Sequence, residues 1–287
     1  MSEHSMTERS LLLVHAHPDD ETIGTGATMA KYAAEGVRVT LVTCTLGEEG
    51  EILVPALEQL AAGQADQLGG WRIHELDKAC AALGVRDHRF LGGAGHYRDS
   101  GMMDTEANKN PRCFWQADVD GAAAHLVEII EEVRPQVVVT YDDFGGYGHP
   151  DHIQAHRVAT RAVEQTRAIV EKFYWTAIPR SVIQASIEAM KEQGHDFFGG
   201  AESADDVPLA KPDDVITAQV DARDYLDHKI EAMRAHASQI AVDGPFFALS
   251  NNIGHKAFGL EYFMLVHGKR GPGQGEFEWE SDLFAGL

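Results

Sequence analysis

Cysteine and basic residues are scarce in this sequence. Its 287 residues include three cysteines, none at CxxC spacing, which argues against a disulfide framework and against a thiolate zinc site. The expected compartment is therefore the reducing cytoplasm. Only 24 basic residues face 45 acidic ones, and the formal charge of −21 would repel nucleic acid and an anionic membrane surface alike. Neither is an expected partner.

Long apolar runs are also missing. Val137–Val139 and Phe263–Val266 are strand-sized and far shorter than the roughly 20 residues that cross a bilayer. The first ten residues are polar and lead directly into Leu11–Val14, without the basic region, apolar stretch and small-residue cleavage site of a secretion signal. We expect neither a transmembrane segment nor a secretion signal.

Short apolar runs instead alternate with amphipathic segments through the first half of the chain. Strands are expected at 11–14, 37–42, 89–91 and 137–139, and helices at 27–34, 73–83 and 122–130. This alternation is typical of βαβ units around a mostly parallel sheet. The pattern predicts an α/β fold, a Rossmann-like three-layer sandwich.

The second half of the chain predicts a C-terminal elaboration of the same fold. Helices are expected at 155–163, 181–190 and 224–238, and strands at 170–175, 215–220 and 262–266. Segments 194–214 and 268–275 are rich in glycine, proline and acidic residues, so loops are expected there, too short for a domain linker. We expect one domain over 1–287, with a metal-binding core at 1–175 and an elaboration at 176–287 that completes the pocket.

Two long connections, 47–68 and 92–118, separate expected elements of the core. Structureless connections of that length are uncommon in compact domains unless they are functional. We expect both to line a pocket.

The first group of reactive side chains, AHPDDE at 16–21, directly follows the first expected strand. Ligands bind at the carboxyl ends of strands in doubly wound sheets. His17 and the three acids Asp19, Asp20 and Glu21 offer imidazole and carboxylate ligands suited to zinc or iron, with one carboxylate left for acid–base work. A helix cap would explain one aspartate. It would not explain the histidine, or three consecutive acids whose repulsion a cation relieves.

The second group, GGYGHPDH at 145–152, follows another expected strand in the same way. Two loops that carry His-Pro-Asp at strand ends can converge on one metal. Three protein ligands with an open position for water form a catalytic rather than a structural site. The pattern favours His17 and His152 as ligands, although a surface or packing role is the ordinary one for any single histidine.

A competing motif, GTGATMA at 24–30, loosely fits the dinucleotide fingerprint GxGxxA. It leaves open a non-catalytic metal- or nucleotide-binding module. The preceding acids would repel a pyrophosphate, however, and the second strand ends in Thr43–Thr45 without an acidic residue for a ribose. We expect these glycines to allow close helix packing instead.

Three segments together resemble the PIG-L/LmbE-like zinc-dependent N-deacetylases over nearly the whole chain: AHPDDE at 16–21, TLGEEGE at 45–51 and GGYGHPDH at 145–152. The resemblance implies one zinc ion per chain, with ferrous iron as the alternative, held by His17, Asp20 and His152. It implies that Asp19 is the general base.

The same resemblance extends to the groups around the reacting carbonyl. It implies that His149 and Tyr147 face that carbonyl. A protonated His149 could stabilise the oxyanion or protonate the departing amine. Asp151 is expected to orient His149 through a hydrogen bond.

Wider segments are similar to those members of the family that release acetate from N-acetylglucosaminyl-inositol in mycothiol biosynthesis, namely QLGGWRIHEL at 67–76, LGGAGHYRDSGM at 91–102 and KFYWT at 172–176. The resemblance then implies a small N-acetylated sugar–inositol substrate, bound by Arg72 and Asp99, with Glu51 near the metal. The alternative enzyme is the mycothiol S-conjugate amidase, which needs a wider pocket. The alternative for Arg72 is a pair with Glu75 on a solvated helix face. Neither pattern indicates an oligomeric state.

Overall fold

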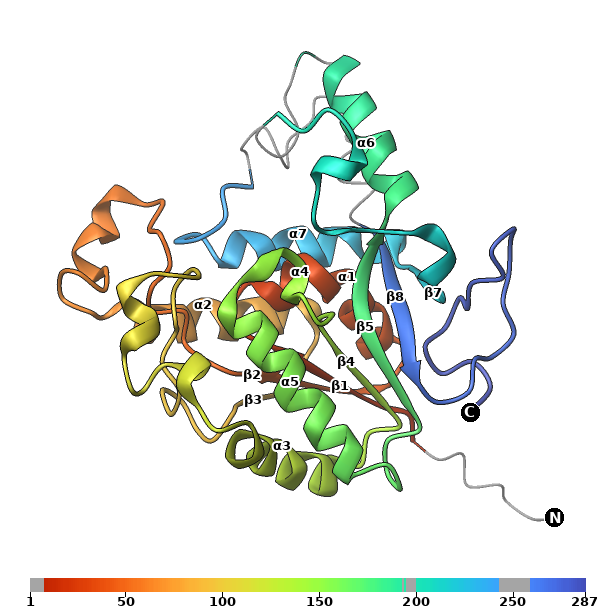
Figure 1. The fold of residues 1–287 in the computed structure, drawn as a ribbon, viewed down its shortest axis with the longest axis horizontal. Helices are drawn as coiled ribbons and strands as arrows, with labels where there is room; N and C mark the ends of the chain where they lie inside the picture. Colours follow the sequence, from red (N-terminus) through yellow and green to blue (C-terminus); the bar gives the residue numbers. More distant parts are fainter. Residues whose placement is uncertain (1–7, 193, 195–199, 243–258) are drawn as a thin grey trace.

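The computed structural model describes residues 8–192, 194, 200–242 and 259–287, whose strands form one sheet of eight strands (Figure 1). The strand order is β3-β2-β1-β4-β5-β8-β7, with β6 paired to β5. Strands β1 to β6 pair in parallel, and β8 runs antiparallel to both β5 and β7. The strands are β1 (Ser10–His15), β2 (Arg38–Thr43), β3 (Asp87–Phe90), β4 (Val137–Thr140), β5 (Lys172–Pro179), β6 (Ala210–Lys211), β7 (Ala218–Asp221) and β8 (Leu260–His267).

Helices cover both faces of the sheet. One layer contains α1 (Asp20–Ala34), α2 (Leu68–Leu83) and α7 (Leu226–Ala235), and the other contains α3 (Val119–Val133) and α5 (Pro150–Gln165). Successive side chains of a strand point to opposite faces. Accordingly Leu11 and Leu13 of β1 pack into the first layer, while Leu12 and Val14 pack into the second. The described residues therefore confirm the three-layer α/β sandwich.

The remaining helices lie in the connections. They are the single turn α4 (Gly145–Gly148), the helix α6 (Arg180–Glu192) and the 3-10 turns Pro55–Leu60, Glu106–Lys109, Phe114–Gln116, Ala204–Asp206, Asp213–Val215 and Arg223–Tyr225. Three of these turns lie within the long connections 47–68 and 92–118, so neither connection is structureless.

Several element boundaries differ from the sequence predictions, and three of these differences have a clear physical reason. Helix α1 begins at Asp20 rather than at 27, because its first turn is acidic and carries no apolar periodicity. Strand β6 lies inside the predicted loop 194–214, where its two residues are too few to produce an alternating pattern. The expected end of the core at 175 falls within β5, since β8 and β7 extend the same sheet.

The glycines of the GTGATMA segment lie inside α1 rather than in a turn. A Cβ at Gly26 would lie 3.3 Å from the Lys229 side chain and 3.7 Å from that of Leu83. Gly26 thus allows α1 to approach α7 and α2 closely, as the sequence predicted. The three cysteines are free and buried, which confirms that no disulfide framework is present. None of the described helices combines the length and apolarity that crossing a membrane requires.

A buried ion pair attaches the C-terminal segment to the sheet. The Lys172 ammonium on β5 lies 2.6 Å from the Glu280 carboxylate, and both side chains are fully buried. Glu280 also accepts the Tyr174 hydroxyl at 2.8 Å, and Lys172 donates to the Ala285 carbonyl at 2.8 Å. Each charge therefore has several partners, as a buried charge requires.

We predict that Lys172→Met lowers the free energy of unfolding by about 3–5 kcal/mol, because it leaves Glu280 as an uncompensated buried charge. Urea denaturation measures the loss. Lys109→Met is the matched control, since Lys109 forms an exposed pair with Glu106 and its removal should leave stability unchanged within error. Equal losses in the two variants would contradict the prediction.

Candidate active site

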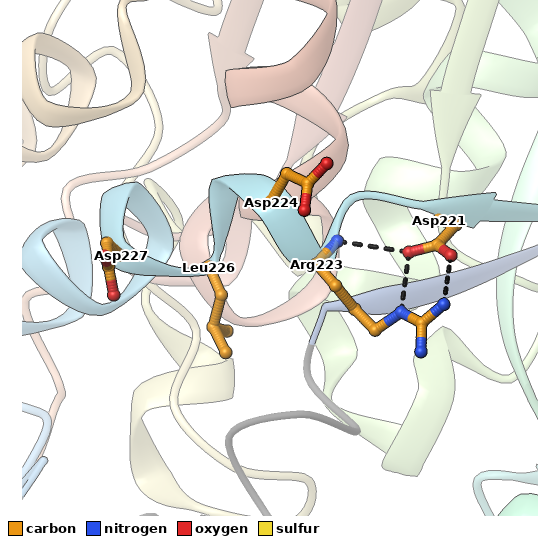
Figure 2. A pocket seen from close by; sticks show the side chains of 5 residues that line it. All are labelled: Asp221, Arg223, Asp224, Leu226 and Asp227. Carbon is orange, nitrogen blue, oxygen red and sulfur yellow. Dashed lines mark hydrogen bonds and ion pairs between the residues drawn. The ribbon is translucent and has the colours of Figure 1, made fainter.

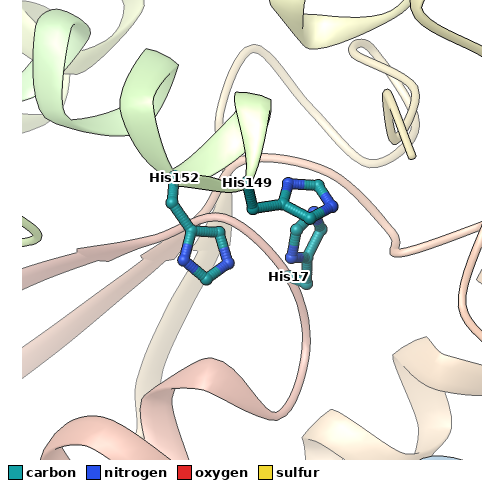
Figure 3. Close-up of side chains that lie close together, drawn as sticks. All are labelled: His17, His149 and His152. Carbon is teal, nitrogen blue, oxygen red and sulfur yellow. The ribbon is translucent and has the colours of Figure 1, made fainter. Parts of the chain in front are cut away.

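The site lies where the order of the sheet reverses, between β1 and β4. From β1 the chain proceeds to β2 and β3 on one side and returns to β4 on the other. Connections that leave neighbouring parallel strands in opposite directions open a crevice at their carboxyl ends. His17 lies just after β1, and His149 and His152 lie after β4, at the start of α5 (Figure 3).

The three imidazoles of this crevice lie close together. The ring centroid of His17 is 4.6 Å from that of His149 and 5.2 Å from that of His152. One nitrogen from each ring lies within 4.8 Å of the others, and all three residues are buried. The convergence of the two His-Pro-Asp loops is therefore present in the structure.

The Asp20 carboxylate lies between two of these rings. Its Oδ2 is 3.2 Å from Nδ1 of His17 and 3.2 Å from Nε2 of His152, and it accepts the backbone N–H of His17 at 2.9 Å. The two imidazoles lower the pKa of Asp20, although burial opposes this. This donor set is the imidazole and carboxylate combination that a zinc or iron ion binds.

The His152 ring is oriented as a metal ligand requires. Its Nδ1 lies 3.2 Å from the Gly145 carbonyl, which places the proton on Nδ1 and leaves the Nε2 lone pair facing Asp20. That Nε2 is buried without a hydrogen-bond partner among the described residues. Tyr141 stacks on the ring at 4.2 Å between centroids, and its hydroxyl accepts the Ala16 N–H at 2.8 Å. An orphaned buried nitrogen beside a carboxylate fits a bound cation.

Glycine is required in the loop before α5. A Cβ at Gly145 would lie 2.6 Å from that of His152, and Gly145, Gly146 and Gly148 all have positive φ. Tyr147 projects from this loop with 48% of its surface exposed, and its ring lies 5.0 Å from that of His152. The tyrosine therefore lies at the open side of the histidine cluster.

Asp19 adopts a backbone conformation that is unusual for a residue with a side chain. Its φ is +105°, and although it precedes α1 its carboxylate makes no capping hydrogen bond. The carboxylate instead lies 3.0 Å from the Arg72 guanidinium. Burial raises the pKa of Asp19 to about 6, with Arg72 opposing the rise. Strained residues of this kind concentrate at functional sites, and the capping alternative does not apply.

The Asp151 carboxylate faces His17, and the hydrogen bond that Asp151 makes to His149 comes from its backbone N–H. Its Oδ2 lies 3.1 Å from Nε2 of His17 and accepts the Ser100 N–H at 2.9 Å, while its Oδ1 accepts the Ser100 hydroxyl. His149 is the N-cap of α5 instead, and its Nδ1 accepts the backbone N–H of Asp151 at 3.1 Å. Pro150 favours the first helical position, so the residue before it, His149, becomes the N-cap. The spacing of residues in the sequence does not reveal where the side chain of Asp151 points.

The protonation of His149 follows from its contacts. Burial, together with the nearby His17 and His152, lowers the pKa of His149 to about 3. Because Nδ1 accepts a hydrogen bond, the neutral ring carries its proton on Nε2. His149 is thus a neutral donor in this structure rather than the protonated acid that the sequence analysis considered.

Arg72 is buried, which rules out the alternative of a pair with Glu75 on a solvated helix face. It is 3% exposed, contacts the Pro18 carbonyl and donates to the Gly47 carbonyl at 2.8 Å, in addition to facing Asp19. Glu75 accepts from Trp71 Nε1 at 3.0 Å and from the Ser238 N–H at 2.9 Å. Tertiary contacts bury this face of α2, which its sequence alone cannot reveal.

Asp99 and Glu51 have different surroundings. The Asp99 carboxylate accepts the N–H groups of Gly101 at 2.8 Å and Glu49 at 3.1 Å, and it lies 3.6 Å from Nε2 of His17. His17 lowers the pKa of Asp99 although burial raises it. Glu51 is exposed, and within the described part of the chain it forms no hydrogen bond or ion pair with the histidine cluster.

A surface cavity of about 750 Å³ lies elsewhere, between β7 and α7 (Figure 2). It is lined by Asp221, Arg223, Asp224, Leu226 and Asp227. Asp221 binds the Arg223 guanidinium at 2.9 and 2.5 Å, so the positive charge there is neutralised. This cavity contains none of the histidines and is separate from the site.

Comparisons with known proteins place these observations in a family. The model of the GlcNAc-PI de-N-acetylase family, PIG-L, matches residues 12–163. The 1D-myo-inositol 2-acetamido-2-deoxy-alpha-D-glucopyranoside deacetylase of Acidothermus cellulolyticus is 69% identical over 97% of this chain and 95% of its own length.

Two solved structures share the fold at low identity. The N,N'-diacetylchitobiose deacetylase of Pyrococcus horikoshii is 20% identical, with a TM-score of 0.56 over 90% of this chain and 84% of that one. A 4-carboxy-2-hydroxymuconate hydratase of Pseudomonas putida is 17% identical, with a TM-score of 0.58 over 93% of this chain and 100% of that one. Since one of these is a hydratase, the fold alone does not determine the reaction. The family match and the high identity over nearly the full length do so, and the chain belongs to the PIG-L family of metal-dependent N-deacetylases.

Proposed function

We propose that this protein hydrolyses the acetamide of N-acetylglucosaminyl-inositol to release acetate and glucosaminyl-inositol. The histidine cluster at the switch point of the sheet carries the proposal, because it combines a metal-ligand set with a separate half-buried carboxylate, Asp19. The identity of 69% to a relative named for this deacetylation supports the choice of substrate. The buried free cysteines are compatible with the reducing cytoplasm, where we place the reaction.

The metal that we propose is zinc, with His17, Asp20 and His152 as its ligands. These residues would hold the ion through Nδ1 of His17, Oδ2 of Asp20 and Nε2 of His152, since the Asp20 oxygen lies 3.2 Å from each of the two nitrogens. When bound, the ion would polarise the acetyl carbonyl and lower the pKa of the attacking water. Asp151 accepts the proton of Nε2 of His17 and so keeps Nδ1 available as a ligand.

The remaining groups act on the water and on the substrate. We propose that Asp19 removes the proton of the attacking water, since its carboxylate is held by Arg72 and is not needed as a ligand. His149, with its proton on Nε2, would donate to the oxygen on which charge develops. Tyr147, on its glycine-flanked turn, would close the pocket over the acetyl group.

Two alternatives share parts of this site. The mycothiol S-conjugate amidase would use the same metal chemistry on a larger conjugate. A non-catalytic binding module would need no strained aspartate beside the metal ligands, and the glycines that could contact a nucleotide lie within α1. Incubation with N-acetylglucosaminyl-inositol and, separately, with a mycothiol conjugate distinguishes them. Acetate release from the first substrate is expected, and cleavage of the conjugate alone would contradict the proposal.

Removing a ligand should have a different effect from removing the base. We predict that His17→Ala, Asp20→Ala and His152→Ala each lose most of the metal, because the shell becomes incomplete. Asp19→Asn should keep the metal while turnover falls by a factor on the order of 10² to 10⁴. Elemental analysis and an acetate-release assay measure the two properties. Metal loss in the Asp19 variant, or full occupancy in the His152 variant, would reverse the assignments.

His149→Ala is expected to retain the metal and to lower kcat more than it changes KM, because a donor to the developing oxyanion acts mainly in the transition state. Tyr147→Phe should lower kcat less than His149→Ala does, since the Tyr147 ring lies at the exposed side of the cluster. Steady-state kinetics with metal-loaded proteins test both. A His149 variant in which KM alone changes would speak against the donor role.

A comparison of two substrates tests whether Arg72 and Asp99 bind the sugar–inositol substrate. We expect Arg72→Ala and Asp99→Ala to lower kcat/KM for N-acetylglucosaminyl-inositol by about 1–3 kcal/mol each. If one of these residues contacts the inositol, its variant should lose less kcat/KM on plain N-acetylglucosamine, which lacks that group. Equal losses on both substrates would show that neither side chain reads the inositol.

A further inference from the structure

A buried histidine far along the chain is connected to Asp19 through Glu21. His236 follows α7 and is completely buried, and its Nε2 lies 2.7 Å from Oε1 of Glu21. Glu21 is also completely buried, and its Oε2 accepts the backbone N–H of Asp19 at 2.8 Å. Glu21 and His236 are 215 residues apart in the sequence, so it is the packing of α7 against α1 that brings the two side chains into contact.

Glu21 is therefore not a free acid of the site. Both carboxylate oxygens have partners, and the Thr22 hydroxyl donates to Oε1 as well. Burial disfavours charge on both residues, but the pairing raises the pKa of His236 and lowers that of Glu21. The contacts thus describe an ion pair whose carboxylate points at a single backbone group, the N–H of Asp19.

That backbone group belongs to the strained residue. With φ at +105°, Asp19 occupies a conformation that a side chain disfavours, and surrounding contacts must hold it there. Arg72 holds its carboxylate at 3.0 Å, while Glu21 holds its N–H. Without the second contact, the peptide before Asp19 could relax and turn the carboxylate away from Arg72.

We infer that His236 is a positioning residue, which acts through Glu21 to hold the strained backbone of Asp19 so that its carboxylate faces the crevice. The inference rests on the proposed role of Asp19 as the base. It assigns a function to a histidine that lies outside every motif of the first half of the chain. It also explains why the third acid of AHPDDE is glutamate, whose longer side chain reaches back two residues to the N–H of Asp19.

The test is a double-mutant cycle on the full chain loaded with zinc. His236→Ala is expected to lower kcat for acetate release at least about tenfold with metal content unchanged, because only the base is displaced. In an Asp19→Asn background, His236→Ala should not lower kcat further, since no base remains to be positioned. An equal fold-loss in both backgrounds, unchanged kcat in His236→Ala, or loss of metal would overturn the inference.

Three further variants distinguish lost positioning of Asp19 from misfolding. His236→Gln places an amide N–H near the position of Nε2 and should recover most of kcat, whereas His236→Asn is too short to reach Glu21 and should not. Glu280→Gln is the matched control, because it weakens another buried ion pair and should lower stability without changing kcat per folded enzyme. Equal kcat in the Gln and Asn variants would also overturn the inference.

The cycle separates this inference from the proposed function. If Asp19→Asn alone retains full turnover, Asp19 is not the base and the proposed mechanism fails. If Asp19→Asn loses turnover, but the fold-losses in kcat from His236→Ala and Asp19→Asn multiply in the double variant, the mechanism stands and only the role of His236 is wrong.

Discussion

The contact of Asp20 with His17 and His152 is the interaction on which the rest of the site depends. It joins the loop after β1 to the start of α5 after β4, two segments that meet only because the sheet reverses its order between these strands. A carboxylate flanked by two imidazoles supplies the ligand set that we propose and balances its charge. In a protein with a net charge of −21, a cation bound at this point would also relieve local repulsion among acids.

Around that contact, each reactive side chain has a second group that holds it. Asp151 and Asp99 face Nε2 of His17, and the Gly145 carbonyl orients His152. Arg72 holds the Asp19 carboxylate. These supports come from the connection 92–118 and from α2, α4 and α5, so tertiary contacts orient the side chains of the site. Preorganisation of this kind reduces the reorganisation needed when charge develops in the reaction.

Much of the fold was predictable because it rests on local patterns. The alternation of apolar strands with amphipathic helices identified the three-layer sandwich and the strands that carry the motifs. The positions of β6 and of the first turn of α1 were not predictable, since two residues show no alternation and an acidic turn shows no apolar periodicity. Family resemblance, rather than spacing, separated Asp20 from Asp19, and the contacts of their carboxylates are consistent with that division.

The sequence by itself determined the kind of chemistry available here, because residue type and position after a strand are local properties: two His-Pro-Asp loops, a surplus carboxylate and no thiolate ligands. Only the tertiary structure decided which atoms face one another. It directed the Asp151 carboxylate to His17, buried Arg72 against Asp19 and placed His236 behind Glu21. The physical reason is that side-chain direction and burial depend on elements packed from distant parts of the chain, and a linear pattern of residue types contains no record of those contacts.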